Sequence, residues 1–523
     1  MFCDHIRNKC AGHFLDGRKL LIGLGSHLAI PRNIGFSSTK TISLKKKIQS
    51  ALLSFLFLGI AFSCLGREPY KPKLTDGKSP DFQDFPMGVL SATGRLHDGE
   101  KEIVVRDVGK GSVAESGGLQ VGDRILSIGG KTPTSFDMSI DSGLEGPQEM
   151  LGKALETACS SKSNLLQLLV RRGEKNMTLK LKVPASPAFA STFPQQCPKS
   201  RKYFSGIVEH LVEVQLDSGS WRPGVGGDAD VYMSAFCALA VLSSGKKEYL
   251  PTVKAAIDFI RKKSISKINT DDPEVGPKSW QAASSAILLA EYQLATGDKT
   301  FFPDLKTCCD LLAGRVSKNG TMGHYYVVSY EGTGLVIINT QAHLAWALAA
   351  KCGYKVDRKA WELSMSEIRK SIDRETGTIR YCSRAKTNLD FTARTGLMAA
   401  AFAIMGKEPK LAHQFADALV KYQARMRYAH SMTSIGLIFG MAGIKSVAPK
   451  AHQAVLRKWI PYLELCRTSV GTAAYFGSKR NYAGDAYLGY NPIGNATVAL
   501  MLASAKNNLF IHGGTKPNWL GAP

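Results

Sequence analysis

Twelve stretches of helical period, of two alternating kinds, dominate the chain from residue 201 onward. One kind is rich in small residues and apolar almost all round, as in residues 234–240. The other carries Lys and Arg on one face, as in residues 252–263. A helix that is apolar on all sides is buried, and an amphipathic helix covers it. Six buried and six outer helices in strict alternation predict an all-α (α/α)6 toroid, with an open solenoid as the alternative. The expected helices are 202–215, 231–244, 249–263, 279–296, 301–315, 336–352, 357–372, 390–405, 409–422, 430–443, 448–466 and 493–506.

The connections between these helices also alternate, in length. Short turns such as 245–248 follow the buried helices, and long loops such as 264–278 and 373–389 follow most of the outer ones. This alternation sends the long loops to the face where the buried helices begin, so that face is expected to carry binding or catalysis. The helix N-termini gathered there also present unpaired N–H groups, which favours an anionic ligand.

A segment of mixed α+β character precedes the helices. Apolar residues alternate with period two in residues 103–105, 166–170 and 177–183, and residues 150–158 form one amphipathic helix. The string GLQVGDRILSIGG at residues 118–130 resembles the signature of a PDZ domain. The sequence therefore predicts a multidomain chain. Its expected parts are a PDZ domain at 81–185, a toroid at 201–523, and linkers at 67–80 and 186–200.

The PDZ resemblance implies that an extended peptide or protein end binds at an edge of the sheet, where backbone N–H groups hold the terminal carboxylate. One wall of that site is expected to be a loop and the other a helix. The alternative is a PDZ domain that only packs against its neighbour. The matching peptide-binding residues are Pro86, Met87, Gly88 and Val89 in the loop and Gln148 on the helix.

A turn motif repeats in three of the long loops, at residues 217–221, 318–325 and 375–381. It resembles the repeat of squalene-cyclase and prenyltransferase toroids. The order of a PDZ domain, the string QCPKS at residues 196–200 and a toroid is similar to an uncharacterised bacterial family of secreted proteins. That resemblance implies an architecture and no reaction.

The N-terminal region has the features of an export signal. Lys45, Lys46 and Lys47 precede an apolar run at residues 51–62, which predicts a signal peptide within a leader of residues 1–66. Residues 1–40 of that leader are either an over-extended start or part of an unusually long leader. Cys64 resembles the lipid-attachment cysteine of a lipobox, and cleavage without lipid is the alternative. The expected location is secreted, periplasmic or anchored to a membrane by lipid.

The chain is strongly basic, with 67 Lys and Arg against 43 Asp and Glu and a net charge of +24. Such an excess indicates an anionic partner, such as an acidic glycan, or a diffuse surface charge. Zinc-knuckle spacing and basic–aromatic RNA motifs are missing from the sequence, which argues against a nucleic-acid partner. We expect no cofactor and no metal, and membrane contact only through an N-terminal lipid.

The long loops contain side chains suited to two reactions. Glycoside hydrolysis needs two carboxylates across a cleft, whereas a lyase uses a Tyr or His base beside a cation that neutralises a uronate. Asp390 also lies where a helix N-cap belongs, and His343, inside a buried helix, is expected to be a core histidine. Our candidate catalytic residues are His430, Asp390, Arg394 and Asp485. Further loop-face candidates are Asp228, Asp230, Glu331, His324, Tyr325, Tyr482 and Tyr487.

Two functions of different classes remain open at this point. The first is an exported protein whose PDZ domain binds peptide or protein ends while the toroid recognises an unknown ligand. The second is a glycoside hydrolase or polysaccharide lyase that acts on an acidic polysaccharide. A carboxylate pair or a His/Tyr/Arg cluster facing one cavity favours the enzyme, whereas a cavity filled by residues 467–492 favours binding.

Overall fold

The structure is a computed structural model that describes residues 81–136, 145–221, 229–325, 334–386, 388, 390–430, 432–477 and 490–521. The described residues fall within one compact unit of the chain. No helix in these ranges is long and apolar enough to cross a membrane. Sequence-based expectations that lie outside the described residues concern the leader 1–66 with Cys64, the linker 67–80, Asp228, Glu331, Tyr482, Asp485 and Tyr487.

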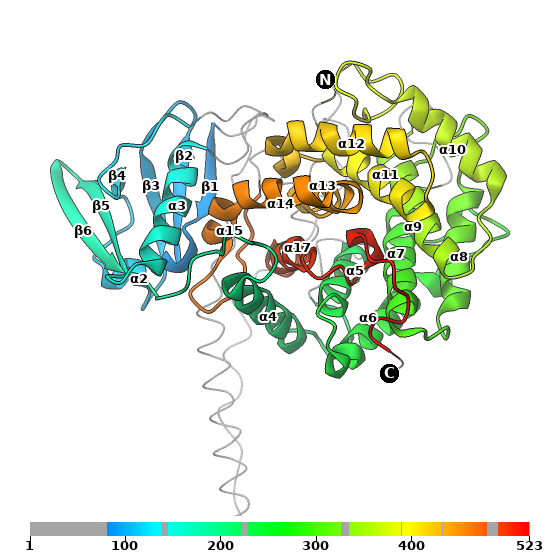
Figure 1. Ribbon diagram of the computed structural model, residues 1–523, viewed down its shortest axis with the longest axis horizontal. Coiled ribbons are helices and arrows are strands. Elements are labelled where there is room, and N and C mark those ends of the chain that lie inside the picture. The colour runs from blue at the N-terminus through cyan, green and yellow to red at the C-terminus, as the bar shows by residue number, and fades with distance from the viewer. Residues whose placement is uncertain are drawn as a thin grey trace, which may run out of the picture. The chain divides into compact units, whose positions relative to one another are not determined.

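The N-terminal part of the described chain is a six-stranded antiparallel sheet with strand order β1-β2-β3-β4-β5-β6, against which helix α3 packs (Figure 1). Leu96, Val105 and Ile125 of this sheet are fully buried. Gly122 and Gly129, on either side of β4, have positive φ angles of 91° and 59°, which a residue without a Cβ adopts readily. This is the predicted PDZ domain. Its elements are β1 (Phe82–Pro86), η2 (Gly88–Leu90), β2 (Ala92–His97), β3 (Ile103–Val108), α2 (Val113–Ser116), β4 (Arg124–Ile128), α3 (Gly146–Ser160), β5 (Leu165–Arg172) and β6 (Lys175–Lys182).

Strand β1 is an element that the sequence pattern did not predict. It pairs antiparallel with β2, from Phe82 opposite His97 to Pro86 opposite Thr93. On its other side, β2 pairs with β3. Both edges of β2 are therefore hydrogen-bonded to strands of the same chain.

The remaining helices form a closed ring of two layers (Figure 1). Each inner helix contacts the next, and the last inner helix, α17, contacts the first, α5, so the ring closes and the structure is the predicted (α/α)6 toroid rather than an open solenoid. The inner helices are buried almost throughout, as their all-round apolar sequences require. They are α5 (Ala229–Leu242), α7 (Ser279–Thr296), α9 (Val336–Lys351), α11 (Thr392–Met405), α13 (Thr433–Val447) and α17 (Tyr490–Ala503). The outer helices are α4 (Pro198–Glu213), α6 (Leu250–Lys263), α8 (Phe302–Gly314), α10 (Arg358–Lys370), α12 (Pro409–Lys421), α14 (Pro449–Lys458) and α15 (Ile460–Cys466).

The eleventh expected helix, 448–466, was wrong in one respect. It is two helices, α14 and α15, which meet at Trp459. Pro461 is the second residue of α15, and its ring nitrogen has no hydrogen to donate to the preceding turn, so the helix breaks just before it.

The repeated turn has a packing role that explains its glycine. Gly219 and Gly320 have φ angles of 86° and 83°, and a Cβ on either would lie 2.1 Å from a backbone oxygen of the next outer helix. These oxygens belong to Ala255 of α6 and Leu363 of α10. These two turns thus each follow one outer helix and pack their bare backbone against the next. In the third turn, a Cβ on Gly377 would meet only the side chain of Gln414, at 3.3 Å.

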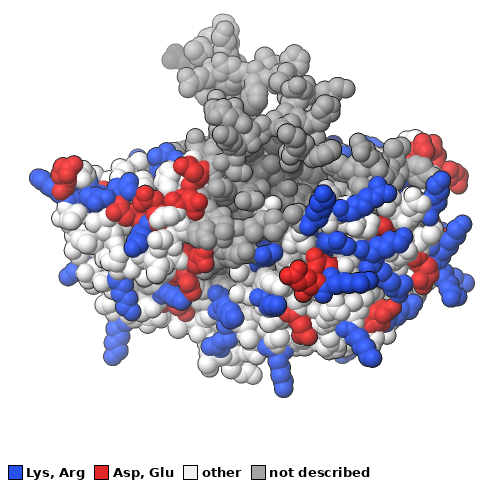
Figure 2. Space-filling model, turned by 90° about the horizontal axis from the view of Figure 1, so that it is seen from above, with Lys and Arg blue, Asp and Glu red and all other residues white. Residues whose placement is uncertain are grey.

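Charged side chains are spread over the face of the molecule that Figure 2 shows. On the face shown in Figure 2, Lys and Arg lie at many separate positions, with Asp and Glu among them. On this face the distribution is that of the diffuse alternative.

Candidate functional site

Six side chains come together where three inner helices begin, on the face that receives the long loops. Trp280 is the second residue of α7, Arg394 lies in the first turn of α11, and His430 lies three residues before α13. Apart from Arg394, these side chains are partly exposed, whereas the unpartnered Nδ1 of His430 and Nη1 of Arg394 are buried. We call this set the His430 cluster, and its members are Trp280, His324, Tyr381, Asp390, Arg394 and His430.

His430 contacts two aromatic rings. Its ring centroid is 5.3 Å from that of Tyr381, with 17° between the ring planes, and 5.3 Å from that of Trp280. Burial, together with the charge of Arg394 and the neighbouring His324, lowers the pKa of His430 to about 4, although Asp390 acts in the opposite direction. The imidazole is therefore neutral at neutral pH. Among the described residues, its Nδ1 atom has no hydrogen-bond partner.

Arg394 is the one member of the cluster that is completely buried, at 0% exposure. Its Nη2 donates to Oδ1 of Asp390 at 2.7 Å, and its Nε donates to the backbone oxygen of Ile379 at 3.0 Å. The third nitrogen, Nη1, is buried and has no partner among the described residues. A guanidinium nitrogen without a partner can donate a charge-assisted hydrogen bond to an anionic group.

Asp390 is held as a carboxylate. Burial alone would raise the pKa of Asp390, but the charge and hydrogen bond of Arg394, with a smaller contribution from His430, keep it below the usual value. The side chain does not cap helix α11, whose N-cap is Phe391, so the expected capping role was wrong. Its partner is Arg394, one helical turn further on.

The tautomer of His324 follows from one hydrogen bond. Trp280 Nε1 donates to Nδ1 of His324 at 2.9 Å, and an indole nitrogen can only donate. Burial and then the charge of Lys278 lower the pKa of His324. The neutral ring therefore carries its proton on Nε2 and presents a donor at that position.

A short backbone contact brings two of the loops together. Phe391 and Ala429 form an antiparallel bridge. In an antiparallel pair, the residue before one partner lies beside the residue after the other, so Asp390 is placed next to His430. This bridge explains how residues 40 positions apart share one site.

The residues predicted to bind a peptide face the protein's own chain. Met87, Val89 and Gln148 are 0% exposed. A Cβ on Gly88 would lie 2.4 Å from the backbone oxygen of Glu464 in α15, and Pro86 is the last residue of β1. In the described structure this surface is therefore covered by β1 and α15.

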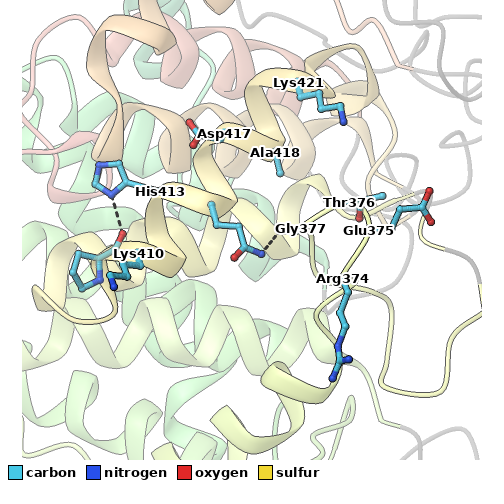
Figure 3. Close-up of a pocket in the computed structure, with 11 residues that line it drawn as sticks. Arg374, Glu375, Thr376, Gly377, Lys410, His413, Asp417, Ala418 and Lys421 are labelled. Carbon is cyan, nitrogen blue, oxygen red and sulfur yellow. Dashed lines mark hydrogen bonds between the residues drawn. The ribbon is translucent and has the colours of Figure 1, made fainter.

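A groove of about 850 Å³ lies elsewhere, between the turn at 373–378 and helix α12 (Figure 3). Its wall includes Arg374, Lys410 and Lys421 but also Glu375 and Asp417, all at exposed positions. Such a mixture of solvated charges is typical of an ordinary surface, so we assign it no function.

Comparison with known sequences places the chain in a family. A sequence model of the family described as a domain of unknown function, DUF6288, matches residues 207–513. The chain belongs to this family. A PDZ domain model matches residues 104–142 of this DUF6288 protein, so the expected union of a PDZ domain with a helical toroid is confirmed. No curated protein matches the sequence.

Solved structures similar to this DUF6288 protein share little sequence with it. One is an inactive variant of an α-1,6-mannanase, GH76A of Salegentibacter sp. HEL1_6, in complex with α-1,6-mannotetrose. It has a TM-score of 0.45 and 12% identity over 59% of this chain and 99% of that chain. A family 76 glycoside hydrolase from a bovine Bacteroides thetaiotaomicron strain has a TM-score of 0.45 and 10% identity over 65% and 83% of the two chains. A type II terpene cyclase from Scytonema has a TM-score of 0.39 and 13% identity over 59% and 99%.

The structure of this DUF6288 protein brings together three of the four predicted catalytic residues, His430, Asp390 and Arg394. It adds His324, a further candidate from the sequence. Trp280 and Tyr381 were missed, although Tyr381 ends one of the repeated turn segments. Two other candidates lie in described parts of the chain but outside the cluster as defined: Asp230 is buried in the first turn of α5, and Tyr325 is exposed. His343 is a core histidine, as expected, and its Nε2 lies 3.0 Å from Oγ of Ser364.

Proposed function

We propose that the helical domain binds an acidic polysaccharide at the His430 cluster and cleaves it by β-elimination. The observation that carries the proposal is the pairing of Arg394, buried with an unused Nη1, with His430, held neutral beside it. A uronate unit offers the two groups that this pair fits, a carboxylate for the guanidinium and an acidic C5 proton for the imidazole.

The aromatic residues of the cluster support a sugar ligand. Trp280 and Tyr381 are partly exposed, and each lies 5.3 Å from the His430 ring, so the three rings form one surface. Binding sites for small polar molecules commonly combine such apolar walls with a few fixed polar groups. Here the polar groups are Arg394 and the Nε2–H of His324.

The chemistry assigns one step to each group. Arg394 Nη1 neutralises the uronate carboxylate and so lowers the barrier to removing the proton on C5. His430 Nδ1 takes that proton, the released electron pair forms the C4–C5 double bond, and the bond from C4 to the glycosidic oxygen breaks. The imidazolium then returns its proton to the leaving oxygen, so His430 ends as it began and no water is consumed.

Elimination is favoured over hydrolysis by the state of Asp390. Hydrolysis of a glycoside ordinarily requires one carboxylic acid and one carboxylate across the cleft. Asp390 is the only carboxyl group of the His430 cluster as defined by the described residues, and its pKa is lowered by Arg394, so it is not a proton donor. A single ionised carboxylate does not supply both roles.

The proposal includes export to the cell envelope, where acidic polysaccharides are met. It rests on the basic and apolar segments of the leader 1–66, with or without lipid on Cys64. N-terminal sequencing and mass spectrometry of the mature protein would test it, because an intact Met1 on a cytoplasmic product contradicts export.

The activity is tested by incubating the protein with uronate polymers and with neutral glycans while following the ultraviolet absorbance of an unsaturated uronate. Absorbance is expected to rise with at least one uronate polymer and not with neutral glycans. His430→Gln should abolish the rise, whereas His413→Gln, an exposed histidine on α12, should leave it unchanged. Cleavage of neutral glycans alone, or full activity in His430→Gln, would overturn the proposal.

A further inference from the structure

The PDZ domain of this chain has an unusual neighbour at its peptide-binding edge. PDZ domains take an extended peptide as an additional antiparallel strand on a sheet edge. The strand after the carboxylate loop is β2, and the position beside it is filled by β1, antiparallel and in register over five residue pairs. Strand β1 thus occupies the place that a peptide from another protein would take.

Strand β1 in turn contacts the helical domain. Phe85 is 0% exposed, and its ring centroid lies 6.0 Å from that of Phe476. Gln83 Nε2 donates to the backbone oxygen of Gly477 at 2.7 Å, while Gln83 Oε1 accepts from Gln148 Nε2 at 3.1 Å. The side chain of Gln83 therefore links strand β1 to helix α3 and to the helical domain.

Helix α15 closes the same surface. Helix α3 and helix α15 approach so closely that a Cβ on Gly152 would lie 2.5 Å from the backbone oxygen of Pro461. Lys199 of α4 pairs with Glu156 of α3 and, at 2.8 Å, with Glu464 of α15. Glu464 is 0% exposed and Lys199 is 3% exposed. Removing one member of such a buried pair leaves an uncompensated charge and is strongly destabilising.

The contact continues to the candidate site. Arg427 Nη2 donates to the same Gly477 oxygen at 3.1 Å, and its guanidinium lies 4.2 Å from the centre of the Phe476 ring. Arg427 is three residues before His430, whose φ angle of 41° is rare for a residue with a side chain. A strained backbone persists only where its surroundings hold it firmly.

We propose that the ligand of this PDZ domain is part of its own chain, and that the domain acts as an internal clamp. The domain packs against β1 and α15. Gln83 and Phe85 of β1 contact residues 475–477, and Arg427, bonded to Gly477, positions the backbone of His430. Gln83 is a positioning residue in this scheme. The inference does not depend on the reaction proposed for the His430 cluster.

Hydrogen exchange of the full-length protein, read by mass spectrometry, tests the clamp. Gln83→Met keeps the length of the side chain and removes the donor to Gly477, so exchange in residues 427–430 and 473–477 should become about tenfold faster. Val105→Ala, in the core of the same sheet, serves as the control for general loosening of the PDZ domain. Unchanged exchange in Gln83→Met, or an equal effect of Val105→Ala on these two segments, would overturn the clamp.

A peptide titration tests whether the groove is closed to other chains. The probes are a synthetic peptide with the β1 sequence DFQDFP and a library of C-terminal peptides, added to the full-length protein at up to millimolar concentration. Chemical shifts near Val89 and Gln148 should not move. Saturable shifts there, with loss of the protection of β1 from exchange, would show a groove that serves partners and would overturn the internal ligand.

Discussion

Gln83 of the PDZ domain and Arg427 of the helical domain donate hydrogen bonds to the same backbone oxygen, that of Gly477. A carbonyl oxygen has two lone pairs, and here each is used by a different domain. The oxygen is buried, so both bonds are costly to lose. Because Arg427 lies three residues from His430, these two hydrogen bonds connect the PDZ domain to the candidate site.

Replacing Arg394 by Lys should weaken binding of a uronate oligosaccharide by about 10- to 100-fold. A lysine keeps the charge but cannot bond Asp390, the oxygen of Ile379 and a carboxylate with three separate nitrogens. Titration calorimetry measures the effect. The matched control is Arg374→Lys, which changes an exposed arginine in the groove between the turn at 373–378 and helix α12. Equal affinities of Arg394→Lys and the unaltered protein would contradict the role given to Nη1.

The stability of the protein should fall as the pH is lowered from about 6.5 toward 3. His452 is 1% exposed, neither ring nitrogen has a partner among the described residues, and burial, with Lys445 and His512, lowers its pKa to about 3. Its folded pKa lies below its unfolded value. The unfolded state therefore binds the proton more readily, and the stability is complete above the unfolded pKa and lost as the pH falls.

His452→Gln should flatten this dependence by up to about 1.4 kcal/mol per pH unit between pH 6.5 and 3. Urea unfolding at a series of pH values gives the slope. The exposed His413, changed to Gln, serves as the control and should leave the slope as it is. The same slope in His452→Gln as in the unaltered protein would show that this histidine is already protonated or freely solvated.

Gly320→Ala should destabilise the toroid by more than about 2 kcal/mol. Its φ of 83° alone costs a residue with a Cβ about 1–2 kcal/mol, and the new Cβ would lie 2.1 Å from the oxygen of Leu363. Gly353→Ala separates the two effects, because its φ is 98° and no atom lies within 4 Å of the added Cβ. Denaturant unfolding of both variants should give a clearly larger loss for Gly320; equal losses would contradict the packing role of the turn.

The sequence predicted the toroid well because the two kinds of helix differ in what they can bury. Most of the expected inner helices begin and end within a few residues of those observed, since an all-round apolar segment has no alternative environment. Strand β1 was missed for the opposite reason. Residues 82–86 are short, alternate poorly and end in proline, and they become a strand only through pairing with β2 and packing against Phe476.

The candidate site was predicted in part, and the reason is again physical. His430, Asp390 and Arg394 are titratable or charged residues next to the all-round apolar inner helices, so they stand out in the sequence. Trp280 and Tyr381 resemble ordinary core aromatics, and only the bridge between Phe391 and Ala429 and the ring contacts show that they share the site. Such contacts between distant segments leave no local pattern.

The central claim is that the His430 cluster cleaves an acidic polysaccharide without adding water. Cleaving the best uronate substrate in water enriched in heavy oxygen, with mass spectrometry of the fragments, tests it most directly. Elimination predicts fragments that end in an unsaturated uronate and contain no heavy oxygen at the cleaved bond. Heavy oxygen at that bond, or no cleavage of any uronate polymer that the protein binds, would contradict the account.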